Sequence, residues 1–332
     1  MTSAVDGFSG AIGNTPLIRL SMLSAYVGRD IFGKAEHLNP GGSVKDRAAL
    51  AIVEDFERRG LLKPGGVVVE GTAGNTGIGL TLVGNARGYR TIIVMPDDQA
   101  PEKYELLRAF GADLRVVPAA PFTNDANYYH EARRVAESIP GAVWANQFEN
   151  TVNRDAHERT TGPEIIAQME GRLDAFVAAA GTGGTLAGTG RALKAHDAAI
   201  RVVLCDPYGS ALYNYVKTGR LEAEGESNAE GIGIKRLTAN FKDAPVDDAV
   251  RVDDRTMIEM AHWLLREAGL FVGGSAALNV AGAARYARTL PPGSRVVTVL
   301  CDGGDRYRSR IYDGGWLAEN GVTPQAKDLS FL

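Results

Sequence analysis

Short apolar segments alternate with longer, helix-like stretches along most of the chain. The β-branched run at 91–95 precedes a helical pattern at 101–110, and the run at 175–179 precedes one at 184–195. Short apolar strands that alternate with helices are typical of βα units, in which a parallel sheet is covered on both faces. The pattern therefore predicts an α/β fold with parallel-rich sheets covered by helices.

The βα units fall into two groups, at about 46–150 and 160–310, which indicates two lobes with a cleft between them. Asp254 is expected to cap the helix that follows it. The long polar stretch 208–248 has no clear period, and a loop of that length is usually functional or mobile. We expect the tail after Asp313 to be a surface appendage.

Composition excludes several classes of protein. Hydrophobic residues make up 45% of the chain and charged residues 23%, as in ordinary globular proteins. The 36 Lys and Arg and the 40 Asp and Glu give a net charge of −4 without a long basic run, which disfavours nucleic acid as a partner. No apolar stretch approaches the ~20 residues that span a bilayer, so no membrane partner is expected. Residues 1–10 lack the features of a signal peptide, and we expect a cytoplasmic protein.

Cysteine and histidine give no sign of a metal site or a disulfide framework. Cys205 and Cys301 each end an apolar run, and we interpret both as buried free thiols rather than as a ligand or nucleophile. The histidines are scattered, without metal-ligand spacing, so no metal is expected. Glycine, with 40 residues, is the one compositional excess, and its clustering is therefore informative.

The glycines gather in four segments, three of which follow an apolar strand and open a helix. Ligands of open α/β sheets bind beyond the carboxyl ends of the strands, so these loops are expected to lie at the functional edge. The segments are 39–47, 70–79, 181–185 and 272–275.

The segment 181–185, Gly-Thr-Gly-Gly-Thr, is the best candidate for a phosphate site. Backbone N–H groups and two hydroxyls at a helix N-terminus suit an anion. The alternative is a tight strand-to-helix turn that needs glycine only for its backbone freedom. A dinucleotide fingerprint fails because Leu186 stands at its sixth position, and no Gly-Lys-Ser or Gly-Lys-Thr motif occurs.

Three further positions each allow two interpretations. Lys45 is either a solvated lysine paired with Asp46 or Glu36, or a Schiff-base lysine whose amine is activated at a helix start. The segment 70–79 suits a carboxylate or phenolate oxygen, or it provides a helix cap at Asn75. Ser275 is either a functional hydroxyl or an ordinary N-cap.

Together these motifs resemble one enzyme family. Asn39-Pro-Gly-Gly-Ser-Val-Lys-Asp-Arg47, Ala73-Gly-Asn-Thr-Gly-Ile-Gly79, Gly181–Thr185 and Glu230-Gly-Ile-Gly233 resemble the cysteine synthase (O-acetylserine sulfhydrylase) and cystathionine β-synthase family. The resemblance runs from about residue 6 to residue 312. It implies a two-lobed, tryptophan synthase β-like fold (fold type II) and the cofactor pyridoxal 5′-phosphate.

The resemblance also implies a role for each site residue. Lys45 would form the Schiff base with the cofactor and move protons, Asn75 would bind the pyridoxal 3′-oxygen, and Ser275 would face the pyridine nitrogen. The cofactor phosphate would be held by Gly181, Thr182, Gly183, Gly184 and Thr185. The substrate would be bound by Thr72, Ala73, Asn75, Thr76, Gln147 and Gly231.

The implied reaction is β-replacement on an O-activated L-serine of the O-acetylserine type through an aminoacrylate, with sulfide or a related nucleophile giving L-cysteine or an analogue. Two alternatives are a cysteine desulfhydrase (β-lyase) that releases pyruvate, ammonia and sulfide, and a catalytically silent regulatory protein. The usual synthases carry Ser where this chain has Ala73, and residues 234–236, Ile-Lys-Arg, also depart from the family.

The resemblance finally implies a domain division and an assembly. A smaller mobile domain over 46–153 would carry the carboxylate loop, and 1–45 plus 154–315 would form the larger domain with the cofactor sites. Residues 316–332 would form a C-terminal tail. We expect a homodimer.

Overall fold

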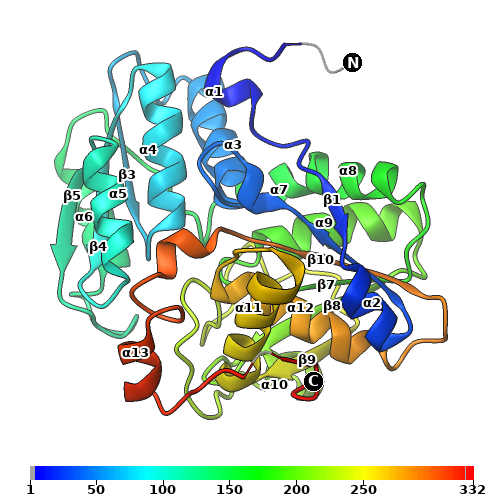
Figure 1. Cartoon of the computed structure of the whole chain (residues 1–332). Coiled ribbons are helices and arrows are strands. Elements are labelled where there is room, and N and C mark those ends of the chain that lie inside the picture. The colour runs from blue at the N-terminus through cyan, green and yellow to red at the C-terminus, as the bar shows by residue number, and fades with distance from the viewer. Residues whose placement is uncertain (1–3, 326) are drawn as a thin grey trace.

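The computed structural model describes residues 4–325 and 327–332. Residues 1–3 of the expected larger domain and residue 326 of the expected tail lie outside the described residues. Two separate β-sheets organise the chain, and Figure 1 shows them as two lobes.

The larger sheet has six strands in the order β1-β2-β10-β7-β8-β9, parallel except for the antiparallel pair β1–β2. Its strands come from both ends of the chain: β1 (Leu17–Arg19), β2 (Asp30–Lys34), β7 (Ala175–Ala178), β8 (Arg201–Pro207), β9 (Asp248–Val252) and β10 (Arg295–Val299). The smaller sheet has four parallel strands in the order β5-β4-β3-β6. They are β3 (Val67–Gly71), β4 (Arg90–Pro96), β5 (Asp113–Val117) and β6 (Val143–Trp144). We call the six-stranded sheet with its helices the large lobe and the four-stranded sheet with its helices the small lobe.

Helices cover both faces of each sheet, because the central strands, such as β3, β7 and β10, are largely apolar and buried on both sides. In the large lobe α12 packs on one face and α9 on the other, and in the small lobe α6 opposes α4. The α-helices are α1 (Gly7–Gly10), α2 (Ser21–Val27), α3 (Lys45–Arg58), α4 (Asn75–Arg87), α5 (Pro101–Ala109), α6 (Tyr128–Ser138), α7 (Val152–Arg159), α8 (Thr161–Gln168), α9 (Gly184–His196), α10 (Leu212–Thr218), α11 (Asp254–Ala268), α12 (Gly274–Ala287) and α13 (Gly314–Glu319). Two 3-10 helices, η1 (Glu36–Leu38) and η2 (Gly304–Tyr307), complete the structure.

Three expectations from the sequence need correction. The cap of α11 is Asp253, whose side chain accepts from Thr256 N, while Asp254 instead binds Ser227 and Asn228. The stretch 208–248 is not one long loop, because Leu212–Thr218 form the short helix α10. The tail contains α13 and buries Leu317 and Leu329 in the core of the large lobe, so it is not a mere surface appendage.

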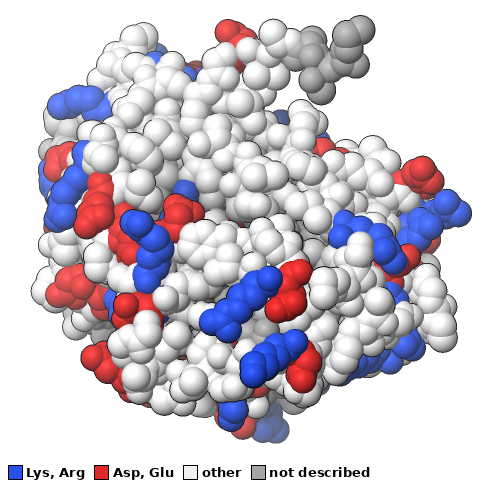
Figure 2. All heavy atoms as spheres, viewed as in Figure 1, with Lys and Arg blue, Asp and Glu red and all other residues white. Residues whose placement is uncertain are grey.

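The charged side chains that the structure describes show no segregation of basic from acidic residues on the visible face (Figure 2). On the face drawn in Figure 2, basic and acidic side chains are interspersed over both lobes. Among the described residues, no helix is both long and apolar enough to cross a membrane.

Candidate active site

A cavity of about 210 Å³ lies where the carboxyl ends of β3, β6, β7 and β10 meet between the lobes. This is the edge at which ligands bind in open α/β sheets. Of the residues that the resemblance assigns to the site, Gly184 does not line this cavity. All the others do: Lys45, Thr72, Ala73, Asn75, Thr76, Gln147, Gly181, Thr182, Gly183, Thr185, Gly231 and Ser275.

Lys45 is the first residue of α3 and is half-buried. Within the described residues, its amine has no ion pair and no hydrogen bond. Its two suggested partners are engaged elsewhere, because Asp46 accepts from Gly41 N at 2.6 Å and Glu36 pairs with Arg47 at 2.7 Å. The structure therefore leaves the amine of Lys45 available in the cavity wall.

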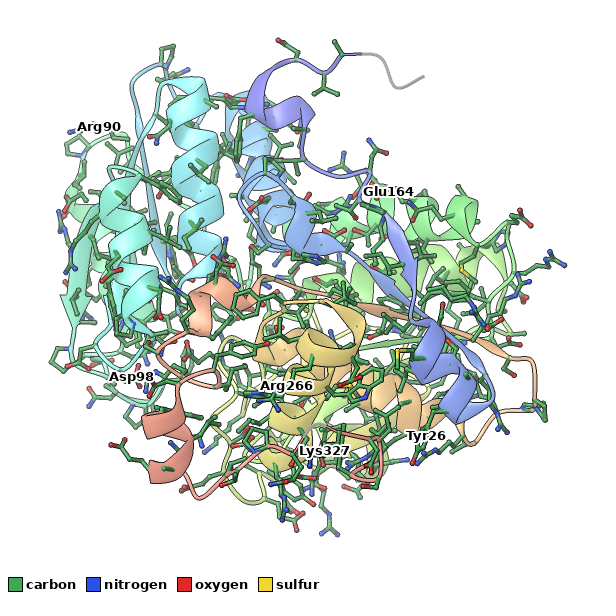
Figure 3. The ribbon with its side chains drawn as sticks, in the orientation of Figure 1. Tyr26, Arg90, Asp98, Glu164, Arg266 and Lys327 are labelled. Atoms are coloured by element: carbon green, nitrogen blue, oxygen red, sulfur yellow. The ribbon has the colours of Figure 1, made fainter. Side chains whose placement is uncertain are left out.

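A buried charge network lies beneath this lysine. Arg47 binds Glu36 and Glu164, and Lys34 reaches Glu164 at 2.6 Å. Burial alone would raise the pKa of Glu164, but the hydrogen bonds from Arg47 and Lys34 outweigh it and lower that pKa to about 2. Glu164, labelled in Figure 3, belongs to α8 of the large lobe. The network therefore ties the start of α3 to the large lobe and fixes the backbone that carries Lys45.

The loop 181–185 approaches its neighbours through bare backbone. A Cβ on Gly181 would lie 2.2 Å from the carbonyl oxygen of Gly231, and one on Gly184 would lie 2.3 Å from Asn153 Oδ1. Gly183 caps α9 with a left-handed φ of 87°, a conformation that favours glycine. The loop is thus a close-packed cradle at a helix N-terminus, which suits a phosphate.

A neutral histidine supports the end of this cradle. The Nε2 atom of His157 lies 3.2 Å from Thr185 Oγ1, and its Nδ1 atom lies 2.8 Å from Thr161 Oγ1. Complete burial, with the positive charges of Arg47 and Lys45 nearby, lowers the pKa of His157 well below its usual value. One ring nitrogen therefore donates and the other accepts, which fixes the Thr185 hydroxyl.

The loop 72–76 faces the cavity from the small lobe with side chains. Thr76 Oγ1 donates to Gln147 Oε1 at 2.5 Å, and Gln147 Nε2 donates to Glu70 Oε1 at 3.0 Å. Burial raises the pKa of Glu70 to about 8, although its bonds with Gln147 act in the opposite direction. Glu70 is therefore protonated at neutral pH, and no negative charge stands behind the residues expected to bind a carboxylate.

A family model described as "Pyridoxal-phosphate dependent enzyme" matches residues 8–302. Cysteine synthase 1 of Neurospora crassa is 52% identical over 321 residues, which cover 95% of this chain and 85% of that protein. The chain belongs to the pyridoxal-phosphate dependent enzymes.

Solved structures of this family share the fold. An O-acetylserine dependent cystathionine beta-synthase from Helicobacter pylori matches with a TM-score of 0.85 at 34% identity, over 94% of this chain and 100% of that chain. An O-ureido-L-serine synthase matches with a TM-score of 0.86 at 36% identity, over 95% of this chain and 100% of that chain. The family, the fold, the enzyme class and the cofactor predicted from the sequence are thereby confirmed.

The cavity of this pyridoxal-phosphate dependent enzyme fits its cofactor. The glycine cradle suits the phosphate, the amine of Lys45 is free for the aldehyde carbon, and Ser275 supplies a hydroxyl from the first turn of α12. Ser275 is not the N-cap of that helix, because Gly273 holds the capping position. Its role towards the pyridine nitrogen stays a prediction.

Asn75 is engaged differently from the expectation. It lines the cavity, but its Nδ2 donates to Asp302 Oδ2 at 2.6 Å and its Oδ1 accepts from Arg306. Tyr307 donates to the same Asp302 oxygen, and Arg306 also donates to Gly41 O. In this structure the amide of Asn75 therefore belongs to a chain that joins the lobes, and its contact with the 3′-oxygen stays a prediction.

Cys301 differs from Cys205 in its surroundings. Cys205 is fully buried, as expected, whereas Cys301 lines the cavity and accepts from Asn279 Nδ2 at 3.3 Å. Burial raises the pKa of the Cys301 thiol to about 11, so it stays protonated and is not a nucleophile at neutral pH.

Several residues at or beside the cavity were not predicted as site residues from the sequence. Lys103 is buried on α5, pairs with Glu230 across the cleft and stands 4.6 Å above the Tyr307 ring. Asp302 and Arg306 follow β10 at the other end of the chain and bind Asn75 of the cavity wall. The glycine pair Gly303-Gly304 lies between them, shortly after an apolar strand, and is a signal that could have found them. The pairing of β10 with β7 and β2 brings them to the site.

Proposed function

We propose that this chain catalyses β-replacement on an O-activated L-serine of the O-acetylserine type, with sulfide or a related nucleophile, to give L-cysteine or an analogue. The high identity to a protein named cysteine synthase supports this reaction. The observation that carries it is the cavity wall, where the unpaired amine of Lys45 lies between a phosphate cradle and a carboxylate site.

In this reaction the Cβ–O bond of the substrate breaks and its electron pair leaves with the acyl group as a carboxylate. A C–S bond then forms with sulfide. Pyridoxal phosphate, when bound, supplies the electron sink that stabilises negative charge at the α-carbon. The Nζ atom of Lys45 removes the α-proton and later returns it, since this amine is free of ionic partners.

The small lobe provides the binding groups for the substrate carboxylate. The hydroxyl of Thr72, which accepts from Gly74 N, would donate a hydrogen bond directly, and charge-assisted bonds of this kind are the strong ones. The hydroxyl of Thr76 and the amide of Gln147 would donate after exchanging their present partners. These partners are Gln147 Oε1 for Thr76, and Glu70 and Gly71 O for Gln147. Protonated Glu70 lies behind Gln147 without repelling the substrate. The ion pair between Lys103 and Glu230 joins the lobes beside the cavity and helps to exclude water.

Product analysis tests the reaction. With O-acetylserine and sulfide, the holoenzyme is expected to form cysteine and acetate in equal amounts. Incubation with cysteine alone is expected to give little pyruvate. Release of pyruvate and sulfide from cysteine without efficient synthesis would assign a desulfhydrase instead, and a protein that stays colourless with pyridoxal phosphate would be a silent member of the fold.

We also propose that the protein is a cytoplasmic homodimer, as its resemblance to the family implies. Light scattering coupled to size-exclusion chromatography would give a mass of two chains. A single-chain mass at micromolar concentration would contradict this assembly.

A further inference from the structure

Arg236 belongs to the large lobe, but its side chain reaches across the cleft to residues of the small lobe. It ends the loop 230–236, which belongs to the large lobe between β8 and β9. Its guanidinium carbon stands 4.2 Å from the ring centre of Phe122, 5.1 Å from Phe148 and 5.4 Å from Tyr129. These three rings, here called the aromatic cage, come from the small lobe and the segment after β6. Arg236 also forms an ion pair with Glu149.

The aromatic cage and the loop border the same cavity from opposite sides. Phe148 lines the cavity, and so do Ile232 and Ile234 of the loop. On the large lobe the loop is held by backbone bonds, from Gly233 N to Ala180 O at 3.0 Å and from Ala211 N to Ile234 O at 2.9 Å. Downstream of the loop, Asn240 Nδ2 donates to Phe148 O and Ala239 N donates to Glu149. Within the loop itself, the side chain of Arg236 contacts the aromatic cage.

The loop has little room to move without disturbing the phosphate cradle. The carbonyl oxygen of Gly231 lies where a Cβ on Gly181 would be, 2.2 Å from that position. Gly231 and Gly233 have φ values of 76° and 75°, so the loop also needs glycine at both places. A shift at Arg236 would therefore reach both the substrate side and the cofactor side of the cavity.

We infer that Arg236 is a positioning residue that holds the loop 230–236 against the aromatic cage and so keeps water out of the cavity during β-replacement. The inference rests on the proposed function. The planar guanidinium suits the site because it stacks on rings while it pairs with a carboxylate, whereas a lysine ammonium is more strongly hydrated. The departure of residues 234–236 from the family pattern thereby acquires a structural role.

The neighbouring Lys235 provides a matched control. It is exposed and lines a separate surface hollow with Pro207 and Tyr208. We expect Arg236→Met, which keeps an unbranched apolar stem but removes the guanidinium group and its charge, to raise the ratio of pyruvate to cysteine about tenfold with O-acetylserine and sulfide. Arg236→Lys should restore part of the difference, and Lys235→Met should match the unmodified enzyme. An unchanged product ratio in Arg236→Met would overturn the inference.

Hydrogen exchange tests whether Arg236 holds the loop 230–236 in place, and this measurement does not depend on catalytic activity. Peptides that cover 230–236 and 122–129 should exchange faster in Arg236→Met than in Lys235→Met, with or without cofactor. Equal exchange would refute the contact's role, whereas failure of the unmodified enzyme to make cysteine would refute only the proposed function. If Arg236→Met does not fold, Phe122→Leu replaces it, since Phe122 is 41% exposed. A smaller rise of the same ratio is then expected, and no rise would overturn the inference.

Discussion

The two loops that face the cavity from opposite lobes are built in different ways. The cradle 181–185 consists of backbone in close contact with Gly231, Asn153 and Phe241, where even one Cβ would collide. The loop 72–76 presents side chains that are held by other side chains, as in the bond from Thr76 to Gln147. The cradle therefore tolerates almost no substitution, whereas the loop 72–76 can lose one side-chain group and keep its other binding groups.

This difference separates the cofactor from the substrate. We expect the close-packed backbone cradle to bind the cofactor phosphate, and its glycine-rich pattern is recognisable from the sequence alone. A carboxylate site made of hydroxyls and amides can be tuned one group at a time, as Ala73 shows. We therefore expect the cradle to constrain the cofactor tightly, whereas the loop 72–76 allows the substrate preference to change.

The largest effect is expected at Lys45, which stands between the two loops and belongs to neither. Lys45→Ala should lower turnover by about 10²–10⁴-fold or more, because both the Schiff-base amine and the proton carrier are lost. The melting temperature should stay close to that of the unmodified enzyme, since Lys45 makes no ion pair within the described residues. Steady-state kinetics and thermal melts check both, with exposed Lys63→Ala as the control. Retained activity would contradict the assignment.

A single methyl group should break the cradle. Gly183→Ala is expected to weaken cofactor binding about 10- to 100-fold, because the left-handed backbone alone costs about 1–2 kcal/mol and the new Cβ would lie 2.6 Å from Phe241 Cβ. Gly219→Ala carries the same backbone strain, with φ 78° and open space around it, far from the cavity. Titration with pyridoxal phosphate, followed by absorbance, compares the two. Equal affinities would show that the close approach does not matter.

A substitution in the loop 72–76 should have a smaller effect than Gly183→Ala, and it should strengthen binding rather than weaken it. Ala73→Ser would restore a hydroxyl beside the carboxylate site, and a hydrogen bond to a charged group contributes about 1.5–3 kcal/mol. We expect KM for O-acetylserine to fall about tenfold while cofactor affinity stays the same. Ala179→Ser adds a hydroxyl to the cavity wall of the other lobe and should leave KM unchanged. A constant KM in Ala73→Ser would remove this residue from the substrate site.

A further prediction concerns the pH dependence of stability. Folding raises the pKa of Glu70 from 4.5 to about 8, so the folded state holds a proton that the unfolded state releases above pH 4.5. The free energy of unfolding should therefore fall between about pH 4.5 and 8, by up to about 1.4 kcal/mol per pH unit, and level off above pH 8. Glu70→Gln should remove this slope in urea titrations across the range, and exposed Glu267→Gln should not. An equal slope in both variants would show that Glu70 is ionised throughout.

Local signals made part of this structure predictable. Helix α4 begins at Asn75 because a glycine turn precedes it, and it ends at Arg87 because Gly88 adopts a left-handed φ of 76°. The turn that leads into α9 was equally visible, because its glycines mark it, and Gly183 has a left-handed φ of 87°. Its role towards a phosphate stays a prediction. Strands β1 and β2 escaped prediction: β1 is an edge strand of three residues, and β2, which lies between β1 and β10, is five residues long and has the charged residues Asp30 and Lys34 at its ends.

Contacts between the lobes were beyond the reach of local signals. Arg306 meets Asn75, Lys103 meets Glu230, and Arg236 meets Phe122, each across a large separation in sequence. Asn75 and Glu230 belong to glycine-rich motifs, but nothing in those motifs indicates Arg306 or Lys103 as the partner. Their meeting depends on how the two sheets are placed, which no local pattern specifies.

The order of the strands in the larger sheet has a consequence for synthesis on the ribosome. Strand β2 pairs with β10, and the segment that precedes Lys45 is held by Val44 N on Cys301 O, so both wait for the last third of the chain. The smaller sheet is complete once β6 has emerged. Because domains fold as units and distant pairings are slow, the small lobe forms first and the N-terminal segment stays undocked for most of translation. Folding of this enzyme therefore ends with the pairing of β2 with β10, whereas α3, which begins at Lys45, can already pack on α4 of the small lobe.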